Sequence, residues 1–144
     1  MKKNLKKLTG ILLLFSMVFA LTACAPMGKE MPDESGAVEN GAVIGQGSKT
    51  FAMEVTDGEG KVTAFTVKSD ADTVGAALLA LGIIAGEDSQ YGLTIITVDG
   101  EAAVWATDNA YWAIWIGEEM AMTGASETPV YDGSIFKLEY TGLG

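Results

Sequence analysis

The chain has 144 residues, one cysteine, no histidine and a formal net charge of −10. This length suits one domain with short flanking segments. The sequence therefore excludes Ser-His and Cys-His catalytic pairs, histidine-based metal sites and an internal disulfide. The excess of acids disfavours nucleic acid as a partner.

Residues 1–23 have the pattern of a secretory leader. Four lysines and no acid precede an apolar run over residues 11–20. That run is about half of the roughly 20 residues that a membrane span needs, so a signal peptide is favoured over a span. It ends at Leu21-Thr22-Ala23-Cys24, which resembles the lipobox of bacterial lipoproteins. We expect lipid on Cys24 and a location at the extracytoplasmic face of the cell membrane; the alternative is an ordinary signal peptide beside a chance cysteine.

A linker is expected after the leader. Residues 24–49 are rich in Gly, Pro, Ser and acids and have no sustained apolar period, which indicates a lipidated, flexible spacer. Residues 50–144 are then the folded domain. Cleavage before Cys24 leaves five basic and nineteen acidic residues, a net charge of −14.

The first elements of the domain are two strands and a helix. Residues 50–55 and 61–67 alternate between apolar and polar side chains, and a turn at 57–60 joins them as a hairpin. Apolar residues at helical spacing predict a helix over 74–81, with capping residues before it and Gly82 at its end.

Four further strands are expected after a loop. They cover 93–98, 102–105, 111–116 and 134–140, with a connection over 117–130. The order β-β-α-β-β-β-β predicts an α+β domain with a β-grasp-like (ubiquitin-like) sheet and one helix.

Three motifs resemble the transcobalamin-like C-terminal domain family. Residues 72–79 resemble its T-V-x-x-A-L helix, residues 111–119 its Y-W strand and turn, and residues 132–141 its closing D-G-D strand. Two positions depart from that pattern: Gly117 follows the strand without the usual Asn, and Ser134 replaces an Asp. The resemblance implies a ligand-binding module for cobalamin or another corrinoid, without the helical domain of the animal carriers.

The aromatic strand supplies the candidate binding residues. Alternation predicts that Trp112 is in the core and that Tyr111 and Trp115 share the opposite face. Trp105, in the neighbouring strand, is expected on a solvated face. These rings could form a flat platform for a ligand, or they could pack under the 117–130 connection or close the sheet edge. The predicted ligand-binding residues are Trp105, Tyr111 and Trp115.

No catalytic or metal site is expected. The adjacent acid pairs Glu87-Asp88 and Glu118-Glu119 are typical of solvated loops, and the Asp-Gly pairs at 57, 99 and 132 do not continue into a calcium-loop pattern. The sequence thus favours a non-enzymatic, membrane-anchored module that captures a small ligand for a transporter, with no cofactor. The alternative is an adhesion module that binds a protein or glycan, through the aromatic face or by strand addition.

Overall fold

The computed structural model describes residues 37–144. The predicted signal peptide, Cys24 and the start of the predicted linker lie outside the described residues. The two helices are α1 (Val74–Ala80) and α2 (Trp105–Asp108). The strands are β1 (Val43–Gly45), β2 (Lys49–Thr56), β3 (Val62–Ser69), β4 (Ile84–Ser89), β5 (Gly92–Val98), β6 (Glu101–Ala102), β7 (Ala110–Ile116), β8 (Glu119–Met120) and β9 (Ile135–Gly142).

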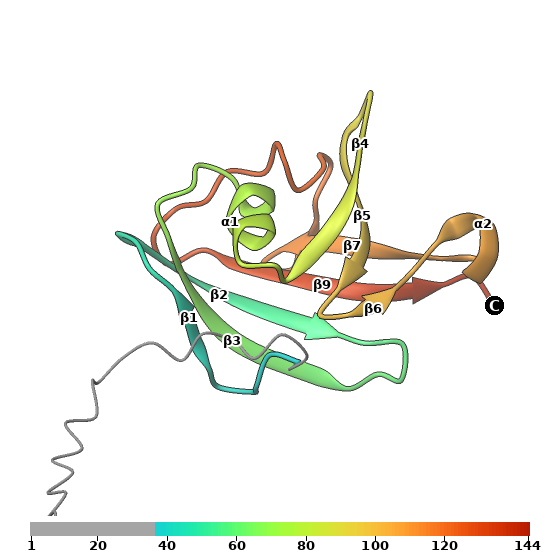
Figure 1. Ribbon diagram of the computed structural model, residues 1–144, viewed down its shortest axis with the longest axis horizontal. Helices are drawn as coiled ribbons and strands as arrows, with labels where there is room; N and C mark the ends of the chain where they lie inside the picture. The colour runs from blue at the N-terminus through green and yellow to red at the C-terminus, as the bar shows by residue number, and fades with distance from the viewer. Residues whose placement is uncertain (1–36) are drawn as a thin grey trace, which may run out of the picture. The chain divides into compact units, whose positions relative to one another are not determined.

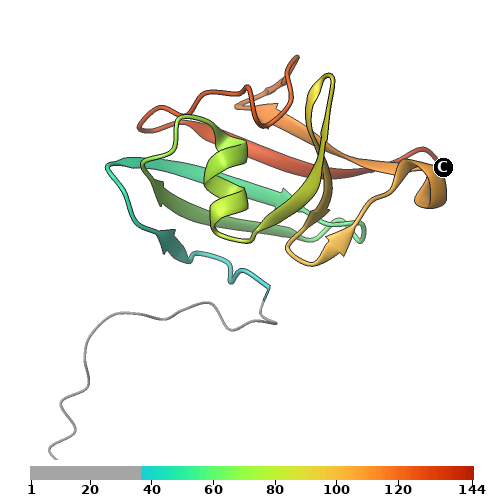
Figure 2. The same cartoon turned by 45° about the horizontal axis from the view of Figure 1, so that its top comes forward.

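The strands form two sheets. The larger one has the order β1-β3-β2-β9-β7-β8, in which β2 runs parallel to β9 and antiparallel to β3, while β7 runs antiparallel to β9. The smaller one has the order β4-β5-β6. Helix α1 and the β4–β5 hairpin stand on the same side of the larger sheet (Figure 1), and α1 lies in front of β2 and β9 when that side is turned forward (Figure 2).

The core lies between the larger sheet and these covering elements. Alternate residues of β2, β3 and β9 point into it, and Phe51 of β2 meets Phe136 of β9 edge to face with ring centroids 5.6 Å apart. Leu78 of α1 and Val98 of β5 close the core from the other side. Burial of apolar area between these layers is the main stabilising contribution.

The α+β class and most of the predicted elements are confirmed. Helix α1 begins where expected, because the Thr73 hydroxyl oxygen accepts a hydrogen bond from the Ala76 N–H and caps the first turn. Gly82 follows the helix with a positive φ of 70°. Trp112 is in the core with an exposed fraction of 6%. Among the described residues, neither helix has the length and apolar character that crossing a membrane requires.

The predicted linker ends too late in the sequence. Within its last residues, β1 pairs in parallel with β3. The Asp99 carboxylate accepts a hydrogen bond from the Val38 N–H at 2.9 Å, and Asn40 accepts one from the Ala64 N–H at 2.8 Å. These side-chain-to-backbone contacts need no apolar pattern, so hydrophobic periodicity does not reveal them.

The element order also differs from the predicted one. The expected loop before residue 93 contains β4, and β1, β8 and α2 add to the predicted elements. Strand β4 is almost entirely exposed and has a bulge at Ala85/Gly86. A Cβ at Gly86 would lie 2.1 Å from the Thr94 carbonyl oxygen, so only glycine permits this pairing.

The predicted strand over 102–105 is wrong at its end. Strand β6 stops at Ala102, and Trp105 begins α2. Asp108 closes this turn, since its carboxylate accepts a hydrogen bond from the Val104 N–H at 2.8 Å. Asn109 ends the turn with a φ of 50°.

Candidate functional site

The larger sheet has one face that the core does not use. We call this the open face: the side of β3, β2, β9 and β7 opposite α1. Glu139, Ala52, Ala64 and Ile135 are exposed there, and none of them belongs to the core cluster. Helix α1 and the β4–β5 hairpin lie on the other side of the sheet (Figure 1).

A row of side chains crosses the open face from strand to strand. Ala64 of β3 is opposite Glu54 of β2, Glu54 is opposite Lys137 of β9, and Lys137 is opposite Trp115 of β7. Neighbouring positions of this kind bring side chains about 4.5–5.5 Å apart at Cβ. Lys137 Nζ lies 3.5 Å from Glu118 Oε1. The row therefore places one ammonium group between carboxylates and an indole ring.

A hollow of about 290 Å³ lies over this row. Besides Trp115, its lining includes four strand residues: Glu54, Thr56, Lys137 and Glu139. Glu118, in the turn that follows β7, lines it as well. Its size is at the lower end of the range for small-molecule sites. The lining combines one aromatic ring with several charged and hydrogen-bonding groups, and it is more polar than most small-molecule sites.

Trp115 carries an unusual polar group for this position. Its indole Nε1 is buried and has no hydrogen-bond partner, although the residue as a whole is only half-buried. A buried N–H without an acceptor costs about 1–3 kcal/mol. The indole Nε1 of Trp112, in the core, is likewise buried without a hydrogen-bond partner.

The other two predicted residues form a separate aromatic pair. The rings of Trp105 and Tyr111 have centroids 6.2 Å apart and are tilted by 53°, and Trp105 is 58% exposed. Tyr111 and Trp115 share one face of β7 but are four residues apart, about 13 Å along the strand. Ala113 between them is only 4% exposed and is outside the core cluster. The three residues thus occupy two places on one side of β7 and not one flat platform, and their role in binding stays a prediction.

Part of the connection after β8 lies against the start of α1, on the side of the sheet opposite these rings. Its backbone lies against the start of α1: the Gly75 N–H donates to the Ala125 carbonyl at 2.8 Å, and the Val74 N–H donates to the Thr128 carbonyl at 2.9 Å. Thr128 is fully buried there. Trp115 consequently remains at the open face. Trp105 is exposed as expected, whereas Ala103, two residues before it, is buried.

A second hollow lies beside the first. It has a volume of about 310 Å³ and is lined on the open face by Ala52, Ala64, Thr66 and Ile135. Glu54 lines both hollows. Sequence reasoning missed both, because they depend on the parallel pairing of β2 with β9, two strands about 80 residues apart in the chain. The outward alternation of Glu54, Lys137 and Glu139 was the available signal.

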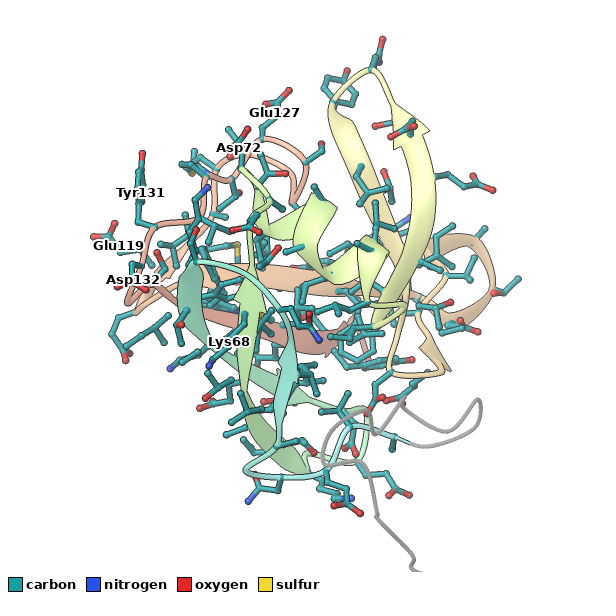
Figure 3. All side chains as sticks on the ribbon, turned by 60° about the vertical axis from the view of Figure 1, so that its left-hand side comes forward. Lys68, Asp72, Glu119, Glu127, Tyr131 and Asp132 are labelled. Carbon is teal, nitrogen blue, oxygen red and sulfur yellow. The ribbon has the colours of Figure 1, made fainter. Side chains whose placement is uncertain are left out.

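Most other acids serve the backbone or point into solvent. The Asp57 and Asp132 carboxylates accept hydrogen bonds from the N–H groups of Lys61 and Thr50 at 2.8 Å. Figure 3 shows the labelled acids at the periphery of the molecule, on separate segments: Asp72, Glu119, Glu127 and Asp132. Within residues 37–144, no group of three or more Asp, Glu, His or Cys side chains is placed to hold a metal ion.

No family model and no curated relative matches the sequence. Among solved structures, the chain is similar to a "putative metal binding protein" from Ruminococcus gnavus ATCC 29149, with 34% sequence identity, a TM-score of 0.63, and coverage of 66% of this chain and 98% of that chain. It is also similar to haptocorrin in complex with Cbi, with 21% identity, a TM-score of 0.49, and coverage of 65% of this chain and 25% of that one. At 34% identity over nearly the whole length of the Ruminococcus gnavus protein, the chain belongs to the family of that protein.

Proposed function

We propose that this chain is a lipid-anchored, extracytoplasmic binding module that captures a small ligand on its open face and delivers it to a transporter. Cobalamin or another corrinoid is the first ligand to test. The anchor rests on the leader pattern and on Cys24. The choice of corrinoid rests on the sequence motifs over residues 72–79, 111–119 and 132–141.

The observation that carries the proposal is the composition of the open face around Trp115. A hollow with an aromatic wall, carboxylates and one ammonium group lies on a face that the core does not require. A protein that needed this sheet only for stability would gain little from placing a large indole there. Aromatic rings beside hydrogen-bonding groups can hold a flat apolar molecule and orient its polar rim.

The chemistry of a corrinoid fits this lining. Its rim carries amide groups, whose N–H bonds donate hydrogen bonds. Glu54 and Glu139 offer carboxylate acceptors next to Trp115. Binding would then combine ring contact with several hydrogen bonds, and it would require no charge on the ligand.

The description of the Ruminococcus gnavus protein names metal binding, for which residues 37–144 of this chain offer no preformed group of ligands. The sequence has no histidine, and the described carboxylates form no group that could hold an ion. We therefore do not extend metal binding to this chain.

A second candidate function is an interaction module that binds a protein or glycan. Strand β4 favours it, since β4 is the outer strand of the smaller sheet and its residues 85–89 are exposed. An outer strand can accept a strand from a partner. The bulge at Ala85/Gly86 and the acids Glu87 and Asp88 are, however, features that protect such edges from pairing.

Isothermal titration with cobalamin tests the proposal. The full chain is placed in lipid nanodiscs, with empty nanodiscs as the blank. We expect saturable binding with about one site per chain, loss of binding in Trp115→Ala, and unchanged binding in Tyr91→Ala, which alters an exposed ring on the β4–β5 hairpin. Equal affinities for both variants, or the absence of binding to the wild type, would move the assignment to the interaction module.

The membrane anchor is tested separately. We expect Cys24→Ala to move the protein from the membrane fraction to the soluble fraction, because the acceptor for lipid is gone. A variant that stays with the membranes would contradict the lipoprotein assignment.

A further inference from the structure

The two hollows on the open face lie next to each other and share Glu54 in their linings, and we call the pair the trough. The first lies over β9 and β7, the second over β3 and β2, and both use Glu54 as a wall. The register places Ala64, Glu54, Lys137 and Trp115 in one line along the trough. A molecule that filled both halves would run across the strands, at right angles to their direction.

The β3–β2 half of the trough is apolar. Its floor contains two exposed alanines, Ala52 and Ala64, and the side chain of Ile135 is 54% exposed at its edge. Val62 and Val43, on the same face of β3 and of its neighbour β1, are exposed as well. Small residues between larger aliphatic ones form a shallow depression that favours an apolar chain or ring.

The β9–β7 half is acidic. Three carboxylates surround it, those of Glu54, Glu118 and Glu139, against the single ammonium group of Lys137. Only Glu118 lies within 4.0 Å of that ammonium group, at 3.5 Å, and the Glu118 side chain is 92% exposed. The other basic residue on the open face, Lys68, lies on β3 opposite Thr50 and does not line this half. This half of the trough therefore keeps a net negative charge.

We infer that the trough selects an elongated amphipathic ligand, with its apolar part over Ala52 and Ala64 and a positively charged end beside Trp115. The inference rests on the proposed function only in that the open face binds a ligand. It names a ligand class other than a neutral corrinoid, with a defined charge and direction. A cation beside the indole ring gains a cation–π attraction, and the uncompensated carboxylates add a Coulombic one. An anionic end meets the same carboxylates and is rejected.

Three probes of equal length and different charge test the inference: 4-phenylbutylammonium, 4-phenylbutanol and 4-phenylbutyrate. Each is titrated into the full chain in lipid nanodiscs at low and at physiological salt, against empty nanodiscs. We expect the ammonium probe to bind most tightly, the alcohol more weakly and the carboxylate least. The preference for the ammonium probe should shrink as salt rises. Equal affinity for the ammonium and carboxylate probes, or no binding of any probe, would overturn the inference.

Single substitutions test which half of the trough holds the charged end of the ligand and which half holds its apolar part. Glu54→Gln should weaken binding of the ammonium probe about threefold, as expected for a partly exposed ion pair, and leave the alcohol unchanged. Ala64→Glu should weaken all three probes, because it places a charge in the apolar half. Glu87→Gln on β4 is the matched control and should change nothing. Equal effects of Glu54→Gln and Glu87→Gln would overturn the inference.

The outcome is separable from that of the corrinoid test. Charge-selective binding of the probes with no binding of cobalamin would support the trough and reject the corrinoid. Binding of cobalamin that Trp115→Ala abolishes, with no charge preference among the probes, would support the proposed function and overturn the inference.

Discussion

The two faces of β9 lie in different environments. Leu138 and Phe136 point into the core and are almost fully buried, whereas Lys137 between them points to the open face beside Trp115. Adjacent residues of one strand thus serve two different environments. The comparison teaches that the covered face determines stability and that the open face is free to serve binding.

The largest expected effect is a difference in stability between substitutions of two adjacent residues, one on each face of β9. Leu138→Ala should lower the free energy of unfolding by about 2–5 kcal/mol, because it leaves a cavity in a packed core. Lys137→Ala should change it by no more than about 0.5 kcal/mol. Denaturant unfolding of both variants measures this difference. Similar losses for the two variants would mean that the open face is part of the stabilising structure.

A second expected effect concerns the segment that covers the core beside α1. A Cβ at Gly75 would lie 2.7 Å from the carbonyl carbon of Ala125, a backbone atom. Gly75→Ala should therefore destabilise by about 1–3 kcal/mol from overpacking, although alanine is normally the better residue inside a helix. Thermal unfolding followed by circular dichroism checks the sign. A raised melting temperature would show that the connection is not held against α1.

A third, smaller effect is expected at the helix cap. Thr73→Ala removes the acceptor for the Ala76 N–H and should cost about 1 kcal/mol, while Thr73→Ser should retain most of the stability. The measurement is again denaturant unfolding. Ligand affinity of the open face should not change, so a parallel loss of affinity would couple the two faces.

The smallest effect is a pH dependence at the rim of the sheet. The backbone N–H and the hydroxyl of Ser48 donate to Asp70 at 2.7 and 2.8 Å and lower the pKa of its carboxyl group. A pKa that is lowered in the folded state stabilises the protein at pH values above the pKa of the unfolded chain. This stabilisation is lost as the pH falls through the lowered pKa of the folded state. The wild type should melt slightly higher than Asp70→Asn at pH 7, and the difference should shrink as the pH falls below about 4 and vanish below the lowered pKa of the folded state. A difference that persisted at low pH would contradict this assignment.

The sequence predicted the elements whose side chains alternate or follow helical spacing. The alternation of Phe51, Met53 and Val55 located β2, and the apolar spacing with Thr73 before it located α1. These signals are direct consequences of burying one face of an element. The same logic placed Trp112 in the core and Tyr111 and Trp115 on the opposite face.

The remaining features depend on backbone contacts that leave no side-chain pattern. Strand β4 is held by pairing with β5 and by the absence of a side chain at Gly86. Strand β1 is held by pairing with β3, and the segment before it by the hydrogen bond from Val38 to Asp99. The position of Trp105 was likewise decided by one local hydrogen bond of Asp108. The hollows follow from the register of β2 with β9, which single-sequence reasoning cannot provide.

The three tryptophans offer the most direct test of the difference between the faces. Trp112 is in the core, Trp115 lines the hollow and Trp105 is exposed near Tyr111. The chain is labelled with 5-fluorotryptophan, its three ¹⁹F signals are assigned by single Trp→Phe variants, and cobalamin is added. We predict that the Trp115 signal shifts most, that Trp105 shifts less and that Trp112 stays in place. A shift confined to Trp112, or no shift at any of the three residues, would contradict the assignment of ligand binding to the open face.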